Sequence, residues 1–286
     1  MSTDVLVAQD LSCVGQVSMS VALPLLGAAG LRPTVLPTAL LSTHTGGFGT
    51  NTYLDLSGEI EKIVNHWNSL NLNFSAVYLG YLGQGPLNTL LQHFEELVTP
   101  KTFSLIDPVM GDNGHLYHGF DNGYIEGMRN LVKKAHLITP NVTEAALLLG
   151  KPPSNRALSL LEAQDLLEEL VQVFNKQQII LTGVHLVNDK IAVLGCDEIS
   201  REIWDQQISK IPGNYFGTGD IFASILFIML LKGADIKTSV STAMEFVSDS
   251  IQSTLEIPGF DTRYGVNYAP HLPNLLNKIA HIQRGN

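Results

Sequence analysis

Short apolar runs alternate along the chain with longer, helix-like segments. The short runs are almost continuous in apolar residues, as expected for strands that are covered on both faces. The pattern predicts strands at Val5–Ala8, Thr34–Pro37, Ala76–Leu79, Phe103–Ile106, Leu137–Thr139, Ile179–Thr182 and Ile191–Leu194. It predicts helices at Ser18–Ala29, Glu59–Leu70, Leu87–Leu97, Gly123–Lys133, Thr143–Leu149, Leu160–Phe174, Ile221–Leu231, Ile236–Leu255 and Leu272–Gln283.

This alternation is typical of an α/β fold, and it predicts a three-layer αβα sandwich with a mainly parallel central sheet. No internal repeat, low-complexity segment or linker interrupts the pattern. Three Pro/Gly-rich clusters are short enough to be surface loops, namely Gly111–Gly119, Pro152–Asn155 and Pro258–Gly265. We therefore expect a single domain over residues 1–286.

The composition fits a compact globular protein, with 45% hydrophobic and 15% charged residues. The formal net charge is −10. A surface that binds nucleic acid or an anionic membrane needs clustered Lys and Arg, so we expect neither as a partner. Backbone amides and a metal ion can still hold a small anionic ligand.

The chain has two cysteines, Cys13 and Cys196, and no CxxC pair, which argues against a disulfide framework or a zinc site. The N-terminus shows no basic segment followed by an apolar core, so no signal peptide is predicted. The longest apolar run, Ile221–Leu231, is too short to span a bilayer. The simplest interpretation of the cysteine content is that the protein works in the reducing environment of the cytoplasm.

Residues 213–231 read GNYFGTGDIFASILFIMLL and place Asp220 at the start of an apolar run. Gly217 and Gly219 let the backbone turn tightly, so that successive amides point the same way. At a helix N-terminus such amides favour an anion. Asp220 then stands where it can take a proton from a substrate hydroxyl, with Thr218 in the same turn. The residues alone do not decide between this catalytic role and a purely structural one, in which Asp220 only stabilises the start of the helix.

Two further groups of polar residues follow predicted strands, where ligands bind in such sheets. Asp107 ends a strand and Asp112 lies in a glycine-rich turn, so the two carboxylates could hold Mg²⁺ through water. Asp-Asn-Gly is also ordinary turn sequence, which leaves the role of Asp112 open. Asn141 and Glu144 have the spacing of a helix N-cap and its third-position acid, and this favours a structural role.

The stretch STHTGGF, residues 42–48, places His44 between two threonines, before two glycines. This suits a loop that contacts or closes over a polar ring, although a lone His is more often structural. The chain contains neither a GxxxxGK[ST] nor a GxGxxG phosphate loop, so a nucleotide would bind through another architecture. It contains no Gly-x-Ser-x-Gly elbow, which argues against an esterase.

The order of these motifs resembles that of the ribokinase superfamily and, within it, of the pyridoxal kinases. The residues Gly217-Thr218-Gly219-Asp220 are similar to the superfamily's anion-hole and catalytic signature. DPVMGD at 107–112 resembles the DPVxGD stretch of pyridoxal kinases, and TPNVTE at 139–144 resembles their TPNxxE segment. HTG at 44–46 and GY at 80–81 resemble two further motifs of that family. The resemblance covers nearly the whole chain.

The resemblance implies a ribokinase-like fold and ATP-dependent phosphorylation of the 5′-hydroxymethyl group of pyridoxal, pyridoxine or pyridoxamine. It implies that Asp220 is the general base and that the amides of residues 217–220 hold the transferring phosphoryl group. The implied substrate-binding residues are Asp10, Thr45, Tyr81 and Asp220. The implied nucleotide-binding residues are Asp107, Asp112, Tyr117, Thr139, Asn141, Glu144, Thr182 and Gly183, with Asp107 and Glu144 organising Mg²⁺. The family also implies a homodimer and, in many members, a monovalent cation such as K⁺.

The chain departs from many pyridoxal kinases after its first strand, where their Gln-Ser-His segment reads Gln9-Asp10-Leu11. If these segments align, Asp10 replaces a serine that contacts the pyridine ring of the substrate. Because a carboxylate can accept a hydrogen bond or pair with a cationic amine, we expect Asp10 to shift the preference among the three vitamers.

Two other functions stay open. The hydroxymethylpyrimidine kinases share DPVM and TPN, but they often have Cys in place of Asp220, and their first strand usually leads into a Ser/Gly-rich loop. One enzyme could also act on both substrates, because each is an aromatic ring that carries a hydroxymethyl group. A non-catalytic ring-binding or regulatory protein on the same fold would not need the carboxylate of Asp220.

Overall fold

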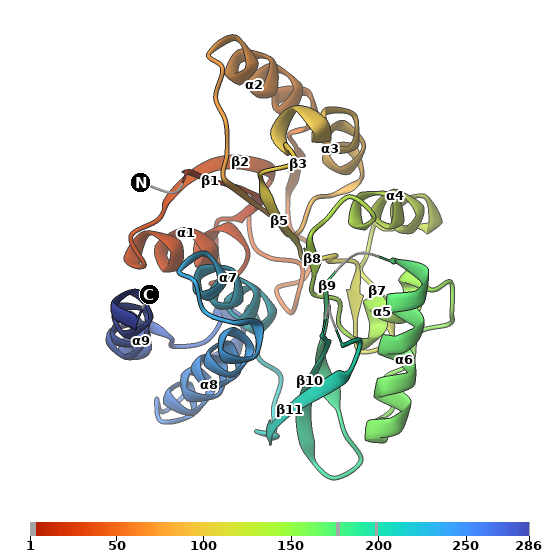
Figure 1. The fold of residues 1–286 in the computed structure, drawn as a ribbon, viewed down its shortest axis with the longest axis vertical. Helices are drawn as coiled ribbons and strands as arrows, with labels where there is room; N and C mark the ends of the chain where they lie inside the picture. The colour runs from red at the N-terminus through yellow and green to blue at the C-terminus, as the bar shows by residue number, and fades with distance from the viewer. Residues whose placement is uncertain (1–3, 176–177, 198–199, 286) are drawn as a thin grey trace. The chain divides into compact units, whose positions relative to one another are not determined.

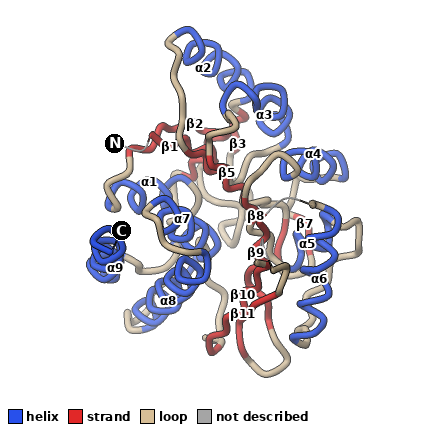
Figure 2. The backbone as a smooth tube through the Cα atoms, in the orientation of Figure 1, coloured by secondary structure: helices blue, strands red, loops and turns tan. Residues whose placement is uncertain are grey.

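The computed structural model of the chain describes residues 4–175, 178–197 and 200–285. Figures 1 and 2 show the helices and strands of the chain. The chain divides into two compact units. Unit 1 comprises Met1–Leu54 and Ile211–Asn286, and unit 2 comprises Asp55–Lys210. Each unit combines strands with helices, as the sequence predicts.

In unit 1, the parallel strands β1 (Asp4–Ser12) and β2 (Arg32–Leu41) are connected by helix α1 (Met19–Ala28). A parallel pair requires such a crossover, and α1 supplies it. The register of β1 against β2 shifts between Gln9 and Leu11. An irregularity of this kind re-aims side chains, and here it falls on the predicted substrate-binding segment.

Helix α7 (Thr218–Leu231) forms the core of unit 1. Every residue from Ile221 to Met229 is buried, so the helix is apolar on all sides. Helix α8 (Ile236–Leu255) runs beside it and α1 also packs against it (Figure 1). Burying one Leu, Ile or Phe side chain contributes about 1.5–3 kcal/mol, so α7 is a firm support for the residues at its start. The other helical elements of unit 1 are η1 (Thr262–Tyr264), η2 (Ala269–His271) and α9 (Leu272–Gly285).

Unit 2 is built on strands that lie in the order β11-β10-β9-β8-β5-β4. The pairs β4–β5, β5–β8 and β8–β9 are parallel, whereas β10 is antiparallel to both β9 and β11. The strands are β4 (Ala76–Leu79), β5 (Phe103–Ile106), β8 (Leu137–Ile138), β9 (Gln178–His185), β10 (Lys190–Cys196) and β11 (Ile203–Ser209). The helices are α2 (Ser57–Ser69), α3 (Gln84–Leu97), α4 (Asn122–Val132), α5 (Val142–Leu148) and α6 (Leu160–Val173).

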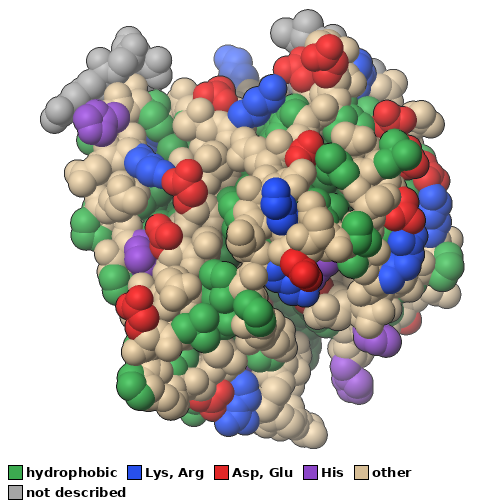
Figure 3. All heavy atoms as spheres, turned by 90° about the horizontal axis from the view of Figure 1, so that it is seen from below, with side chains coloured by type: hydrophobic (Ala, Val, Ile, Leu, Met, Phe, Trp, Pro, Cys, Tyr) green, Lys and Arg blue, Asp and Glu red, His purple; other side chains and the backbone are tan. Residues whose placement is uncertain are grey.

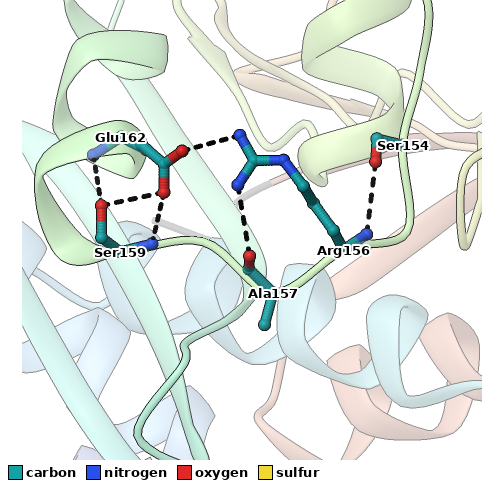
Figure 4. A network of polar contacts seen from close by, with 5 residues as sticks. All are labelled: Ser154, Arg156, Ala157, Ser159 and Glu162. Atoms are coloured by element: carbon teal, nitrogen blue, oxygen red, sulfur yellow. Dashed lines mark hydrogen bonds and ion pairs between the residues drawn. The ribbon is translucent and has the colours of Figure 1, made fainter.

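Helix α6 begins with a capping box, which explains why the sequence pattern starts there (Figure 4). The Ser159 hydroxyl accepts from the Glu162 amide at 3.2 Å, and Glu162 Oε2 accepts from the Ser159 amide at 2.8 Å. Arg156 donates to the other oxygen of Glu162 at 2.7 Å. The bond from Arg156 and the bonds from Ser159 lower the pKa of Glu162 to about 2.

All the predicted strands and helices are present, and most of their ends shift by one to four residues. Helix α7 begins at Thr218 rather than at Ile221, so Asp220 lies inside its first turn. The prediction that Gly111–Gly119 is only a loop is wrong, because this segment holds a small hairpin of β6 (Gly111–Asp112) and β7 (His115–Leu116). The sequence pattern also missed β3 (Tyr53–Asp55) and β11, whose side chains are exposed or only half-buried and give little apolar signal.

Charged side chains of both signs are mixed on the surface. On the face drawn in Figure 3, Asp and Glu lie among Lys and Arg. Exposed ion pairs such as Lys278–Glu245 and Lys134–Glu95 follow from this mixing, and pairs of this kind contribute little to stability. Among the described residues, no helix combines the length and the apolar character that crossing a membrane requires.

Candidate active site

The loop before α7 ends at Gly217, which adopts the left-handed conformation with φ 78°. A Cβ at this position would lie 2.2 Å from the Gln16 carbonyl oxygen, so only glycine fits the turn. The Thr218 hydroxyl then donates to the Tyr215 carbonyl at 3.2 Å. The first-turn amides of residues 218–220 have no acceptor in the helical ladder, and they are the donors expected to hold an anion.

Asp220 is half-buried in this first turn. Although part of the residue is accessible, burial is the largest cause that raises its pKa, to about 7, and the charge of Asp10 acts in the same direction. A hydrogen bond from the Ser18 amide opposes both. A carboxyl group with this pKa is about half ionised at neutral pH, which suits a general base.

Asp10 lies at the irregular end of β1 and is only 4% exposed. Its Oδ2 accepts from the Ser12 hydroxyl at 2.8 Å. Burial raises the Asp10 pKa, and polar interactions with Ser18 and Ser12 lower it again. Asp10 and Asp220 therefore form a pair of interacting carboxylates in unit 1.

His44 is buried at the centre of a cluster of loops in unit 1. Its Nδ1 accepts from the Gly46 amide at 3.1 Å, so the proton is on Nε2, which donates to the Arg263 carbonyl at 2.6 Å. The His44 ring packs against Phe216, with centroids 4.8 Å apart, and a Cβ on Gly46 would lie 2.3 Å from that same phenyl ring. His44 therefore joins the 42–48 loop to the loop before α7, while Thr45 beside it is exposed.

Unit 2 carries a second group of polar residues, arranged around the buried Glu144. Glu144 Oε1 accepts from the Met110 amide at 3.1 Å and Oε2 from the Asn141 amide at 2.9 Å. Asn141 Oδ1 accepts from the Glu144 amide at 2.9 Å, which completes a capping box at the start of α5. Thr139 Oγ1 donates to Asp107 Oδ1 at 3.1 Å. The predicted structural role of Asn141 and Glu144 is therefore confirmed.

The carboxylates of this group repel one another. Glu144 and Asp107 are 3% and 8% exposed. Burial, and then the charge of Asp107, raise the Glu144 pKa well above its usual range, against the hydrogen bonds from the amides of Asn141 and Met110. A divalent cation near the pair would relieve this repulsion.

The donor set fits a metal ion that is held mostly by water and phosphate. Both oxygens of Glu144 already accept a backbone hydrogen bond, so one lone pair on each remains for a water ligand. Within the part of the chain that the structure describes, no three His, Cys, Asp or Glu side chains gather into a metal-binding cluster. Mg²⁺ commonly keeps several waters and takes one or two carboxylates, which agrees with the expected pair Asp107 and Glu144.

The remaining expected nucleotide residues lie on neighbouring segments of unit 2. Asp112 is exposed in the β6–β7 hairpin and accepts from the Asn113 amide at 2.8 Å, and Tyr117 follows this hairpin. The Thr182 amide donates to the Pro140 carbonyl at 2.9 Å, so β9 continues alongside the TPN segment. Gly183 is exposed with φ 59°. The expected substrate residue Tyr81 packs against Phe120, with ring centroids 5.4 Å apart.

Sequence reasoning missed Ser18, whose polar groups lower the pKa of both Asp10 and Asp220. Its position before α1 suggests an ordinary helix cap, and nothing in the sequence shows that its φ is positive, at 46°. It also missed the Ser12 hydroxyl. It missed the Met110 amide because a backbone donor leaves no residue-type signal.

Comparison with known proteins identifies the family. The sequence model of the phosphomethylpyrimidine kinases matches residues 29–263, and the chain belongs to this family. A pyridoxal kinase structure from Lactobacillus plantarum is 33% identical, with a TM-score of 0.88 over 98% of both chains. A Bacteroides thetaiotaomicron structure with pyridoxal, described as a phosphomethylpyrimidine kinase, is 30% identical, with a TM-score of 0.87 over 98% of this chain and 96% of that one. The pyridoxine/pyridoxal/pyridoxamine kinase of Bordetella avium is 28% identical over 88% of this chain and 85% of its own.

These similarities confirm the ribokinase-like α/β fold with a mainly parallel sheet that the sequence predicts. They also confirm the resemblance to pyridoxal kinases.

The two glycines of the turn provide a matched test of its geometry. We expect Gly217→Ala to destabilise the protein by about 2–4 kcal/mol, because a left-handed Ala and the contact with Gln16 both add strain. Gly219→Ala is the control, since its Cβ would meet nothing within 4 Å. The measurement is chemical unfolding of the two variants, and equal stabilities would contradict the proposed constraint at Gly217.

Proposed function

We propose that this chain is an ATP-dependent kinase that phosphorylates the 5′-hydroxymethyl group of the vitamin B6 vitamers pyridoxal, pyridoxine and pyridoxamine. The observation that carries the proposal is Asp220, a carboxyl group with a pKa near 7 in the same helical turn as the amides expected to hold an anion. The names of the relatives from B. avium and L. plantarum, and the pyridoxal in the B. thetaiotaomicron structure, support this substrate class.

The two units supply different parts of the proposed reaction. In unit 1, the ionised Asp220 takes the proton of the substrate hydroxyl, while the amides of residues 218–220 stabilise charge on the transferring phosphoryl group. In unit 2, Thr139 and Thr182 would lie near the nucleotide phosphates, and Asp112 and Tyr117 would belong to a flap over ATP. Asn141 would help to organise Mg²⁺ and its waters. Mg²⁺, organised by Asp107 and Glu144, would neutralise phosphate charge, and K⁺ is the proposed monovalent cation. We propose that both units act as one kinase domain.

A second candidate function is phosphorylation of hydroxymethylpyrimidine, alone or together with the vitamin B6 vitamers. The name of the family and the description of the B. thetaiotaomicron protein favour it. The carboxylate of Asp220, where those enzymes often have Cys, favours the vitamers.

We propose a cytoplasmic homodimer. Cys13 and Cys196 are both free thiols, as suits a reducing compartment. Val35 and Leu40 of β2 are 39% and 38% exposed, and a second copy of the chain would cover them. Light scattering at assay concentrations checks the assembly.

An activity assay separates the candidate functions. The purified chain is incubated with ATP, Mg²⁺ and K⁺ and with each candidate alcohol, and ADP and phosphorylated product are measured together. We expect turnover of at least one vitamin B6 vitamer and loss of turnover when a chelator removes Mg²⁺. Turnover of hydroxymethylpyrimidine alone would select the second candidate, and binding without turnover would indicate a regulatory protein.

The pH dependence of the reaction tests the role of Asp220. Only the ionised carboxylate can accept a proton, and its pKa is raised to about 7, so kcat/KM should fall about tenfold per pH unit below that value. Asp220→Asn should lower kcat roughly a hundredfold to ten-thousandfold, leave ATP binding intact and abolish this dependence. The control is Asp235→Asn, which changes the residue that caps helix α8 in the same unit. This variant should have the same kcat as the parent. A near-normal kcat in Asp220→Asn would remove Asp220 from the mechanism.

Exchanging Asp10 for the serine of many pyridoxal kinases tests vitamer preference. The buried carboxylate can pair with the cationic amine of pyridoxamine, so Asp10→Ser should lower kcat/KM for pyridoxamine roughly tenfold relative to pyridoxal and pyridoxine. Asp4→Ser removes a carboxylate from the exposed start of the same strand and should leave the three ratios unchanged. Equal ratios of kcat/KM among the three vitamers in Asp10→Ser and in the parent would contradict the proposed role of Asp10.

A further inference from the structure

The β6–β7 hairpin of unit 2 is too small to hold its shape alone. Each of its strands has two residues, and an isolated hairpin is marginally stable at best in water. Asp112, Asn113 and His115 are exposed, so the hairpin buries little of itself. The Tyr117 amide donates to the Met110 carbonyl at 2.9 Å and extends the pairing by one bond. The remaining support has to come from neighbouring segments.

The first turn of helix α5 holds the base of the hairpin through two side chains. Glu144 Oε1 accepts from the Met110 amide at 3.1 Å. Asn141 Nδ2 donates to the Gly111 carbonyl at 2.9 Å. Both side chains also form the capping box of the same helix, so their positions are set before they reach the hairpin.

A third side chain of the same turn, Thr143, holds the tip of the hairpin. Its Oγ1 accepts from the Gly114 amide at 2.9 Å, and Thr143 is 3% exposed. The backbone of residues 154–155 also lies against the tip, because a Cβ on Gly114 would lie 2.9 Å from the Asn155 amide nitrogen. Gly114 has φ 78°, which a glycine adopts without strain. The tip is therefore held by a hydrogen bond to a buried hydroxyl and by close backbone packing.

The hairpin carries the carboxylate of Asp112 between its base and its tip. Asp112 Oδ1 accepts from the Asn113 amide at 2.8 Å, and Oδ2 accepts from Asn113 Nδ2 at 2.9 Å. The orientation of this carboxylate is thus set within the hairpin, and its location depends on where the hairpin stands.

We propose that Thr143 is a positioning residue that fixes the β6–β7 hairpin, and with it the Asp112 carboxylate, to the helix turn that bears Glu144. The hairpin is then a preformed wall and not a freely moving flap. A preformed wall spares a bound nucleotide the cost of ordering the segment that it contacts. This consequence for the nucleotide rests on the proposed function, whereas the attachment of the hairpin to α5 does not.

Hydrogen exchange of the full chain without ligand, measured amide by amide with NMR, tests the attachment. The Gly114 amide should be protected in the parent, although it lies at the tip of an exposed hairpin. Thr143→Val keeps the shape of the side chain and removes the acceptor, so this amide should exchange roughly fivefold faster or more. Thr143→Ser keeps the hydroxyl and should restore the rate of the parent.

Two controls separate a local effect from a general loss of stability. The Tyr124 amide, which donates to Asp121 Oδ1 at 3.0 Å at the start of α4, should exchange at the same rate in all variants. Thr89→Val removes a hydroxyl that donates to the Gly85 carbonyl at 3.2 Å elsewhere in unit 2, and it should leave Gly114 exchange unchanged. Gly114 exchange in the parent as fast as in an unstructured peptide would overturn the proposal. Equal rates in Thr143→Val and the parent would also overturn it.

Titration calorimetry with ADP and Mg²⁺ tests the consequence for the nucleotide without relying on turnover. The Kd should rise roughly threefold or more in Thr143→Val, because binding then has to order the hairpin, and it should match the parent in Thr143→Ser and Thr89→Val. Faster Gly114 exchange with an unchanged Kd would overturn the positioning role. A parent that binds no ADP would contradict the proposed function, while the exchange rates would still decide whether Thr143 holds the hairpin.

Discussion

The contact between the Gly217 turn and the Gln16 carbonyl is the constraint on which the arrangement of unit 1 depends. Gly265 approaches the same residue from another loop, where an added Cβ would lie 2.8 Å from the Gln16 Cβ. Two turns that require glycine therefore lie against Gln16, although the residue itself is exposed. The Gln16 amide also donates to the Tyr264 carbonyl at 2.9 Å, so the segment before α1 is held against the turn that starts α7. A methyl group added at either glycine would act on all of these at once.

In unit 2, Glu144 has a structural role in addition to the metal-organising role proposed for it. Its carboxylate holds the start of α5 through the Asn141 amide and the loop after β5 through the Met110 amide. These two hydrogen bonds favour the ionised form of Glu144, but burial and the charge of Asp107 outweigh them and raise its pKa. A cation beside the two carboxyl groups would favour the ionised form in the same direction as the bonds that cap the helix.

The sequence allowed most of the fold to be predicted, because buried parallel strands and amphipathic helices leave strong periodic patterns. It also led to the roles proposed for Asp220, Asp107 and Glu144, since carboxylates at strand ends and helix starts are visible as residue types. It could not reveal the positive φ of Ser18, the Met110 amide or the β6–β7 hairpin. Each of these depends on backbone geometry and on contacts between distant segments, which residue types in one chain do not encode locally.

Helix α7 has a consequence for how the protein loses activity. Because residues 221–229 of the helix are all buried, its central turns cannot open without disrupting the interior of unit 1, and their amides should be among the slowest to exchange with solvent. Asp220 is anchored to that slow-exchanging segment. Local fraying elsewhere would leave the carboxylate in place, whereas heat would remove it only together with the fold. Loss of catalysis and loss of native structure should therefore coincide in this enzyme, with no inactive but still folded stage between them.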